Sequence, residues 1–240
     1  MTPTGTAVPR RERARAATIE EIKSIALDLI REQGTTDVKF ADIARAMEMT
    51  PPALYRYFAD RDELFTALIT DAYDDLGRVV GHAREAVADT DFAGRWVAVA
   101  SAYREWARRE PQQFSLIFGA PVPGYAAPDE GPTTEAARRA MSQLSELFVA
   151  AAVRGKLRKP LIRDVDPSLL ACADDKHGEL NGVLAPESFQ AMLGAWSSLH
   201  GFTCLEAYGH LDWMGADARD ALFASQVRLI AKTTGLPVPD

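Results

Sequence analysis

Apolar residues recur every three or four positions along most of this chain, which is the spacing of one face of an α-helix. The first apolar stripe ends before Gly34, a typical helix stop, and contains Ile22, Ile25, Ala26, Leu29 and Ile30. Similar stripes predict later helices over 92–109, 111–118, 133–155, 188–209 and 216–233. No segment keeps the strict alternation of apolar and polar residues that a half-buried β-strand needs. The pattern therefore predicts an all-α fold.

Three more helical patterns lie between the first stripe and residue 92. One predicts a short helix over 40–47, and after the break MEMT another predicts a second short helix over Thr50–Phe58. Asp60 and Glu63 then have the spacing of a capping box, which marks the start of a helix. The longer helix that follows carries the apolar residues Leu64, Phe65, Leu68, Ile69, Ala72 and Leu76.

Two short helices joined by a tight break form the helix-turn-helix arrangement, whose second helix enters the major groove of DNA. The apolar residues of the second helix face the domain core, so its opposite face, centred on Pro52, Ala53 and Arg56, is free. Arg56 is suited to reading a guanine edge, and Tyr55 and Tyr57 beside it can donate hydrogen bonds to phosphates. The alternative to DNA binding is a purely structural role, because short helix pairs also occur in other proteins, where tyrosines on the second helix can fill a core.

The two prolines at the start of this helix fit the same interpretation. Proline is tolerated in the first helical turn because its missing N–H group would have had no partner there. We expect the Thr50 side chain to cap the N–H of Ala53, and the helix to start at Pro52, since a residue before proline resists helical angles. Pro51 and Pro52 would form a rigid apolar tip able to touch thymine methyl groups.

Charge is distributed unevenly along the chain. The formal net charge is −7, yet residues 1–62 hold 10 basic and 10 acidic residues, so the excess acid lies after residue 62. The first 16 residues hold four arginines, among them Arg11 and Arg13, and predict a flexible basic arm that reaches a minor groove. Lys39 and Arg61 are expected to hold phosphates on either side. A solvated, non-binding terminus is the alternative.

The segment IARAMEMTPPALYRYFADRDELFTALI, residues 43–69, resembles the DNA-binding domain of TetR-family (TetR/AcrR) transcriptional regulators. The resemblance covers about 15–70 and implies a three-helix DNA-binding domain joined by a fourth helix to an all-helical ligand-binding and dimerising domain. It places Thr50, Pro51, Ala53, Tyr55, Tyr57 and Arg61 at positions that usually touch DNA. Two residues depart from the family pattern. Glu48 replaces the usual glycine of the turn, so the turn is either strained or slightly different in conformation, and Val38 replaces a threonine that contacts phosphate.

The remaining chain is acidic, helical and rich in aromatic residues, which suits a cavity between helices. We take as candidate ligand-binding residues Trp96, Tyr103, Phe114, Phe118, Phe148, Trp196, His200 and Cys204. The alternative, that these side chains fill a core, applies to most of them. Trp196 and His200 share a helix face, and WSSLHG resembles the Trp-x-x-x-His-Gly signature of one TetR subgroup. A packed, hydrogen-bonded His200 is the competing interpretation.

Other classes of function find little support in the sequence. CADDKHGE, residues 172–179, has metal-ligand residue types but not the spacing of a closed zinc site, so we expect a solvated loop and no metal or other cofactor. The chain lacks a Gly-rich phosphate loop, a G-x-S-x-G elbow and an H-E-x-x-H motif, which argues against an enzyme. It has no apolar run of 18 residues, and its two cysteines suggest no disulfide framework, so we expect a cytoplasmic protein without a membrane segment.

The combined expectation is a DNA-binding regulator built in four parts. These are a flexible basic arm (1–16), a helix-turn-helix domain (17–62), a ligand-binding and dimerisation domain (63–234) and a tail (235–240). Residues 119–132, rich in glycine and proline, are expected to form a mobile loop, and 156–188 to be irregular with a short helix near 167–173.

We expect a homodimer, formed through the last two helices, that represses transcription at a near-palindromic double-stranded DNA operator. A small, mostly apolar effector would release it. The alternative is a ligand-independent dimeric DNA-binding protein whose helical body only dimerises.

Overall fold

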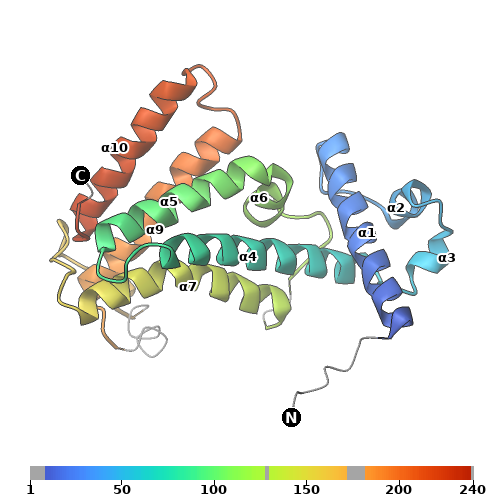
Figure 1. Ribbon diagram of the computed structural model, residues 1–240, viewed down its shortest axis with the longest axis horizontal. Helices are drawn as coiled ribbons and strands as arrows, with labels where there is room; N and C mark the ends of the chain where they lie inside the picture. The colour runs from blue at the N-terminus through green and yellow to red at the C-terminus, as the bar shows by residue number, and fades with distance from the viewer. Residues whose placement is uncertain (1–8, 128–129, 172–181, 239–240) are drawn as a thin grey trace, which may run out of the picture. The chain divides into compact units, whose positions relative to one another are not determined.

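The computed structural model describes residues 9–127, 130–171 and 182–238, and within them it contains helices and no strand (Figure 1). This confirms the all-α fold. The helices are α1 (Arg10–Gln33), α2 (Phe40–Ala46), α3 (Pro51–Leu54), α4 (Arg61–Glu85), α5 (Phe92–Arg109), α6 (Pro111–Phe118), α7 (Pro132–Val153), α9 (Pro186–Ala207) and α10 (Ala216–Thr234). Residues 167–171 are also helical, and the rest of the described chain between α7 and α9 is irregular, as expected.

The chain forms two compact units whose boundary lies inside α4. The head unit consists of Met1–Ala72 and Gln112–Glu135, and the body unit of Tyr73–Pro111 and Ala136–Asp240. The sequence had suggested a division near residue 62.

The difference arises because the loop after α6 packs against the first half of α4. The Tyr125 hydroxyl lies 3.1 Å from the Thr66 hydroxyl, and its ring lies 6.3 Å from that of Phe65. Val122 is buried in the same loop. The expectation of a mobile loop over 119–132 is therefore wrong for these anchored residues.

The head unit is built on α1, α2 and α3, which share one apolar core. Their buried apolar residues are Ile22, Ala26, Ile30, Phe40, Ile43, Ala44 and Leu54, joined by Phe58 after α3. Helix α1 ends at Gly34, whose left-handed backbone (φ 65°) is the conformation expected of a glycine stop. The helix begins earlier than expected, at Arg10, so residues 10–16 are its first turns and not a flexible arm. Residues 1–8 lie outside the described chain.

The turn between α2 and α3 adopts the strained conformation, one of the two alternatives that the sequence left open. Glu48 has φ 54° and is the one non-glycine residue with positive φ in the described part of the chain. Its conformation lets the Met49 N–H reach back to the Ala44 carbonyl at 2.8 Å, which closes the turn. A side chain in this region costs about 1–2 kcal/mol relative to glycine.

Helix α3 differs from its expectation in two ways. It starts at Pro51, not Pro52, and its first N–H bond runs from Ala53 to the backbone carbonyl of Thr50 at 2.9 Å, while the Thr50 hydroxyl makes no capping bond. Pro51 and Pro52 have no N–H groups that need a hydrogen-bond acceptor. The first N–H of the helix is therefore that of Ala53, and the Thr50 carbonyl accepts its hydrogen bond. The regular helix ends at Leu54, and residues 55–57 continue as tight turns.

Helix α5 is the central helix of the body unit. It packs against α9 and α10, beside which it lies (Figure 1), and its residues Val99 and Tyr103 share a cavity lining with residues of α4 and α7. The Trp96 indole N–H donates to the Val227 carbonyl of α10 at 2.8 Å. Helices α4 and α7 approach closely at Gly77, where a Cβ atom would lie 3.2 Å from the Ala140 Cα.

Candidate nucleic-acid interface and body cavity

The free face predicted for the second short helix is present on α3 and the turns that follow it. Leu54 and Phe58 are buried, whereas Tyr55 is 54% exposed and Pro51, Pro52 and Arg56 are also exposed. Ala53 and Tyr57 are half-buried at the edges of this face. The head unit thus presents two prolines, a tyrosine and an arginine to solvent on one short segment, while the apolar side chains of that segment are held in the core.

Neighbouring helices hold this face in position. The ring of Tyr55 lies 5.2 Å from that of Phe40 at the start of α2. From α1, the Arg15 guanidinium lies 5.8 Å from the centre of the Tyr57 ring and donates to the Arg56 carbonyl at 3.5 Å. The N-terminal turns of α1 therefore contact the residues that follow α3 and help to hold them in place. The sequence did not predict this role, because the pattern there suggested a flexible arm.

Of the other residues expected to contact DNA, all except Arg61 are exposed. Arg11, Arg13, Lys39 and Thr50 have exposed side chains, the arginines on the first turn of α1 and Lys39 just before α2. Val38, where the family pattern has a phosphate-binding threonine, is fully buried, which agrees with the expected loss of that contact.

Arg61 is the exception, because its guanidinium is engaged within the head unit. Its Nε donates to the Val38 carbonyl at 3.0 Å, Nη2 to Thr36 at 3.0 Å and Nη1 to Pro123 at 2.9 Å. The guanidinium also lies 4.4 Å from the centre of the Phe65 ring. These contacts give Arg61 a positioning role, tying the start of α4 to the segments before α2 and after α6.

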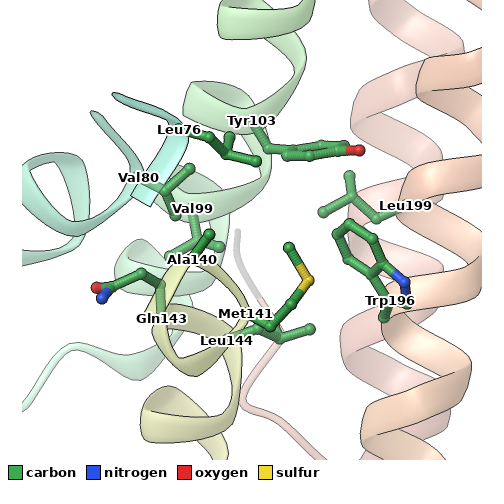
Figure 2. Close-up of a pocket in the computed structure, with 10 residues that line it drawn as sticks. All are labelled: Leu76, Val80, Val99, Tyr103, Ala140, Met141, Gln143, Leu144, Trp196 and Leu199. Carbon is green, nitrogen blue, oxygen red and sulfur yellow. The ribbon is translucent and has the colours of Figure 1, made fainter. Parts of the chain in front are cut away.

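The body unit contains a small apolar cavity lined by residues of α4, α5, α7 and α9 (Figure 2). Its volume is about 30 Å³, and it is lined by Leu76, Val80, Val99, Tyr103, Ala140, Met141, Gln143, Leu144, Trp196 and Leu199. That volume corresponds to roughly one water molecule, whereas small-molecule pockets usually measure about 300–1,000 Å³. In this conformation the cavity is therefore too small to hold a drug-sized molecule.

Only part of the predicted ligand-binding set meets at this cavity. Tyr103 and Trp196 line it, and His200 lies directly behind them, its Nδ1 2.7 Å from the Tyr103 hydroxyl and its ring stacked on Trp196 at 5.0 Å. Cys204 Sγ lies 3.3 Å from His200 Nε2. Trp96 and Phe148 are fully buried away from the lining, as core side chains.

Two further candidates belong to the other unit. Phe114 and Phe118 lie on α6, where their rings pack 5.3 Å apart, and residues 112–135 are part of the head unit. The sequence could not reveal this because α6 directly follows α5 along the chain. Conversely, Met141, Gln143 and Leu144 of α7 line the cavity and were not singled out, since an alanine-rich helix carries no marker of its inner face.

The polar side chains behind the cavity are held neutral by burial. Burial lowers the pKa of His200 and raises the pKa values of Tyr103 and Cys204. A protonated phenol can donate to Nδ1 of a neutral imidazole, which leaves the ring proton on Nε2, facing Cys204. The cavity is therefore bordered by a hydrogen-bonded but uncharged group.

Comparison with known proteins extends over both units. Residues 22–68 match the family described as "Bacterial regulatory proteins, tetR family", and residues 96–230 match "Tetracyclin repressor-like, C-terminal domain". The chain belongs to the TetR family. It is thus a DNA-binding transcriptional regulator and not an enzyme.

Individual relatives agree with the TetR family assignment. The HTH-type transcriptional regulator Rv1816 of Mycobacterium tuberculosis is 31% identical over 219 residues, which cover 88% of this chain and 91% of the relative. The crystal structure of the regulatory protein SCO4313 is similar with a TM-score of 0.73 and 36% identity, covering 93% of this chain and 98% of the other. A tetR family transcription regulator from Shewanella sp. PV-4 shares the fold, with a TM-score of 0.57, 17% identity and coverage of 88% and 96%.

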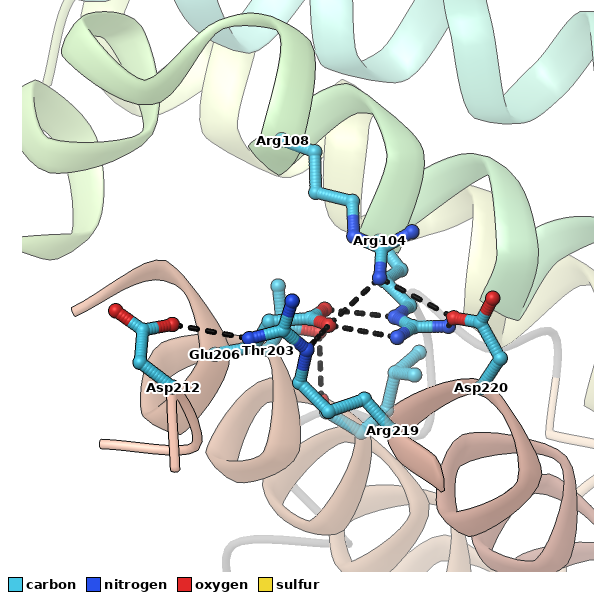
Figure 3. A network of polar contacts seen from close by, with 8 residues as sticks. Arg104, Arg108, Thr203, Glu206, Asp212, Arg219 and Asp220 are labelled. Carbon is cyan, nitrogen blue, oxygen red and sulfur yellow. Dashed lines mark hydrogen bonds and ion pairs between the residues drawn. The ribbon is translucent and has the colours of Figure 1, made fainter. Parts of the chain in front are cut away.

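A buried network of charged residues joins α5 to α9 and α10 in this TetR-family body (Figure 3). Arg104 donates to both carboxylate oxygens of Glu206, at 2.6 and 2.7 Å, and pairs with Asp220 at 2.9 Å. Arg108 pairs with the same two acids. The side chains of Arg104 and Glu206 are only 7% and 8% exposed. Sequence reasoning missed this network, although an arginine within the apolar stripe of α5 was a possible signal.

The pKa of Glu206 reflects this environment. Burial by itself would raise the pKa, but hydrogen bonds and ion pairs with Arg104 and Arg108 outweigh burial and lower it below the ordinary value. The lowered pKa favours the ionised form of Glu206, which accepts hydrogen bonds from two arginines of α5.

Two other expectations concern metals and membranes. Within the described ranges no three His, Cys, Asp or Glu side chains gather in a way that could hold a metal ion. The candidate CADDKHGE segment, 172–179, lies outside those ranges. No helix in the described part of the chain is long and apolar enough to cross a membrane.

Proposed function

We propose that this protein is a homodimeric repressor that binds a near-palindromic operator and leaves it when a small, mostly apolar effector enters the body unit. The observation that carries the DNA-binding part is the exposed segment Pro51–Arg56, fixed between α1 and α2. Arg56 would read a guanine edge, Tyr55 and Tyr57 would donate to phosphates, and the prolines would meet thymine methyl groups. Arg11, Arg13 and Lys39 would add phosphate contacts at its margins.

The proposed dimer rests on an apolar outer face of α9 and α10. Exposed large apolar side chains on or directly after these helices are Leu193, Leu205, Tyr208, Leu222 and Leu229. Between them on α9, a Cβ added at Gly194 or Gly201 would meet no atom within 4 Å. Such a face suits close packing of helices from a second copy across a two-fold axis. Regulators of the family bind DNA and dimerise.

The proposed effector site is the cavity between α4, α5, α7 and α9. Its lining is apolar apart from Gln143 and the edges of Tyr103 and Trp196, so it suits a hydrophobic or aromatic molecule with at most one or two polar groups. Because the cavity holds only about one water, an effector must bind a wider conformation. Helix α4 belongs to both units, so an effector that favours a different position of α4 would change DNA affinity.

The small cavity volume also favours the alternative function. A cavity with room for only about one water molecule agrees with a regulator that dimerises and binds DNA without an effector. The two proposals differ in whether any small molecule alters operator affinity, since a ligand shifts an equilibrium only by its differential affinity for the two states.

The DNA-binding proposal is tested by selecting genomic fragments with purified protein and footprinting those that bind. We expect a protected near-palindrome. Arg56→Ala should lower affinity about 10–100-fold and relax the base preference at one position in each half-site. The control is Arg31→Ala, because Arg31 is also exposed but pairs with Asp28 at the far end of α1. Unchanged affinity in Arg56→Ala would remove Arg56 from the interface.

The effector proposal is tested with the same operator. Apolar and aromatic compounds are screened for thermal stabilisation of the protein, and those that bind are tested for release of the operator. We expect an active compound to lose its effect in Trp196→Ala while operator binding without compound is retained. If compounds that stabilise the protein leave operator affinity unchanged, the effector-independent regulator is the correct function.

A further inference from the structure

A short extended segment of the body unit holds two large aliphatic side chains in solvent. Leu161 and Ile162, between α7 and α9, are 73% and 65% exposed. Isolated exposed apolar residues are common on protein surfaces, but two adjacent ones at this level of exposure form a small apolar knob. We refer to residues 160–162 as the strap.

The strap is fixed to the end of α10. The Leu161 N–H donates to the Thr233 carbonyl at 2.8 Å, and the Arg158 N–H donates to the Gly235 carbonyl at 2.8 Å. Gly235 has φ 86°, and a Cβ at this position would lie 2.1 Å from the Arg158 carbonyl oxygen, so only glycine fits. Two backbone hydrogen bonds and the close approach at Gly235 thus fix the backbone of this segment against the end of α10. The exposed positions of Leu161 and Ile162 follow from this fixed backbone.

The strap itself forms one wall of a groove along the seam between α9 and α10, and Leu161 and Ile162 line that wall while their outer surfaces stay exposed. It has a volume of about 240 Å³, and its floor includes the small residues Ala191, Gly194 and Ser198 of α9 and Thr233 of α10. Its lining contains no charged residue. A surface of this chemistry suits apolar side chains and is unsuited to DNA phosphates or to a charged peptide.

The groove continues the apolar outer face of α9 and α10. Gly194 belongs both to the groove and to that face, and Leu193 and Leu229 expose their side chains on the same two helices. In a two-fold dimer each contact occurs twice, so a knob and an open groove at one end of the same surface can serve both subunits at once.

We propose that the strap is part of the subunit interface, with Leu161 and Ile162 packing against the α9–α10 face of a second copy of this chain. This inference rests on the proposed homodimer and extends it beyond the last two helices. The second copy is the occupant because the knob, the uncharged groove and the open glycine are contiguous with the face already assigned to that copy.

The test is the dimer dissociation constant, measured by sedimentation equilibrium on the full chain. We expect Leu161→Ser/Ile162→Ser to raise this constant at least about 100-fold, since four large aliphatic side chains per dimer would lose their burial. The matched control is Val153→Ser, because Val153 is 67% exposed at the end of α7 but lies outside the groove and the α9–α10 face. Its dissociation constant should stay within about threefold of the wild-type value.

A second measurement keeps the test decisive if the double variant folds poorly. The photocrosslinker p-benzoylphenylalanine is placed at position 161 or at position 153. We expect covalent dimers from position 161 and none from position 153. A dimeric wild type with an unchanged constant in the double variant and no crosslinked dimer would overturn the strap while leaving the homodimer intact. A wild type that is monomeric at all concentrations would overturn the homodimer itself.

Discussion

Two arginine side chains in the head unit have different roles, one on the proposed DNA-binding surface and one in holding that surface in place. Arg61 occupies a position that usually touches DNA in the family, yet its three donor nitrogens meet the carbonyls of Thr36, Val38 and Pro123. Arg56, five residues earlier, has an exposed side chain. The sequence suggested DNA contacts for both arginines, and only the fold shows that the Arg61 guanidinium is engaged within the protein.

Arg61→Ala is therefore expected to destabilise the protein by about 1–3 kcal/mol, because partly buried carbonyls lose a charged donor. Arg61→Lys should recover little, since an ammonium cannot reproduce the planar guanidinium fork. Thermal or urea unfolding measures both, with Arg31→Ala as the control. If Arg61→Ala leaves stability unchanged and Arg61→Lys restores operator affinity, then Arg61 acts as a phosphate contact instead.

Two local features, a strained turn and a nearly buried ion pair, set the orientation of helices that belong to the proposed functional surfaces. The turn between α2 and α3 uses Glu48 at φ 54°, where glycine would be unstrained. In the body unit, Arg104 and Glu206 place a nearly buried ion pair between α5 and α9. Both features fix the direction of helices: the first sets α3 against α2, and the second sets the proposed dimer helices against α5.

Glu48→Gly should stabilise the protein by about 0.5–1 kcal/mol, because relief of the left-handed backbone exceeds the added entropy of glycine in the unfolded chain. Ala46→Gly, two residues earlier at the end of α2, should instead destabilise by a similar amount. Chemical denaturation of both variants provides the comparison. Equal destabilisation by the two glycines would show that Glu48 makes a compensating contact.

Arg104→Ala should destabilise the protein by about 3 kcal/mol or more, because it leaves Glu206 buried with a weakened set of partners. The control is Arg139→Ala, since Arg139 forms a similar bidentate pair with Asp74 in an exposed position. Its loss should cost under about 1 kcal/mol. Similar costs for the two variants would mean that burial does not strengthen the Glu206 network.

The same network predicts a dependence of stability on pH. The pKa of Glu206 is lower in the folded protein than its ordinary value of 4.5, so the unfolded chain binds a proton more readily. The stabilisation by Glu206 is present above about pH 4.5 and is lost as the pH falls through the lowered pKa. Glu206→Gln should flatten this acid limb in unfolding experiments from pH 3 to pH 7. An unchanged limb would assign it to other carboxylates.

The whole molecule combines an electrically balanced DNA-binding region with an acidic remainder. Residues 1–62 are neutral overall, and the excess of acid that gives the chain its net charge of −7 lies beyond them. Attraction to DNA must therefore come from a few local arginines and lysines, while the rest of the molecule is repelled.

Operator binding should consequently weaken steeply with salt, by about 10³-fold between 50 and 200 mM for six or more phosphate contacts per dimer. Titration of a footprinted operator at four salt concentrations measures the slope. Arg13→Ala should reduce the slope by about one counterion per subunit contact without changing base preference. A slope near zero would show that phosphates are not the main source of affinity.

The sequence by itself determined the helical fold, the order of the helices and the family. The helical spacing of apolar residues predicts which face of each helix is buried. Gly34, Glu48 and the prolines before Ala53 influence only the conformation of the backbone close to them. Such signals depend on neighbours along the chain and can be read without knowing the fold.

Only the tertiary structure decided which distant residues meet. It places Phe114 in the head unit, ties Arg61 to carbonyls more than 20 residues away, and limits the cavity lined by Tyr103 to about 30 Å³. None of these outcomes has a local cause, because each depends on how helices far apart in sequence pack against one another. The arrangement of side chains at the proposed sites therefore follows from helix packing, while the presence of the helices follows from the sequence pattern.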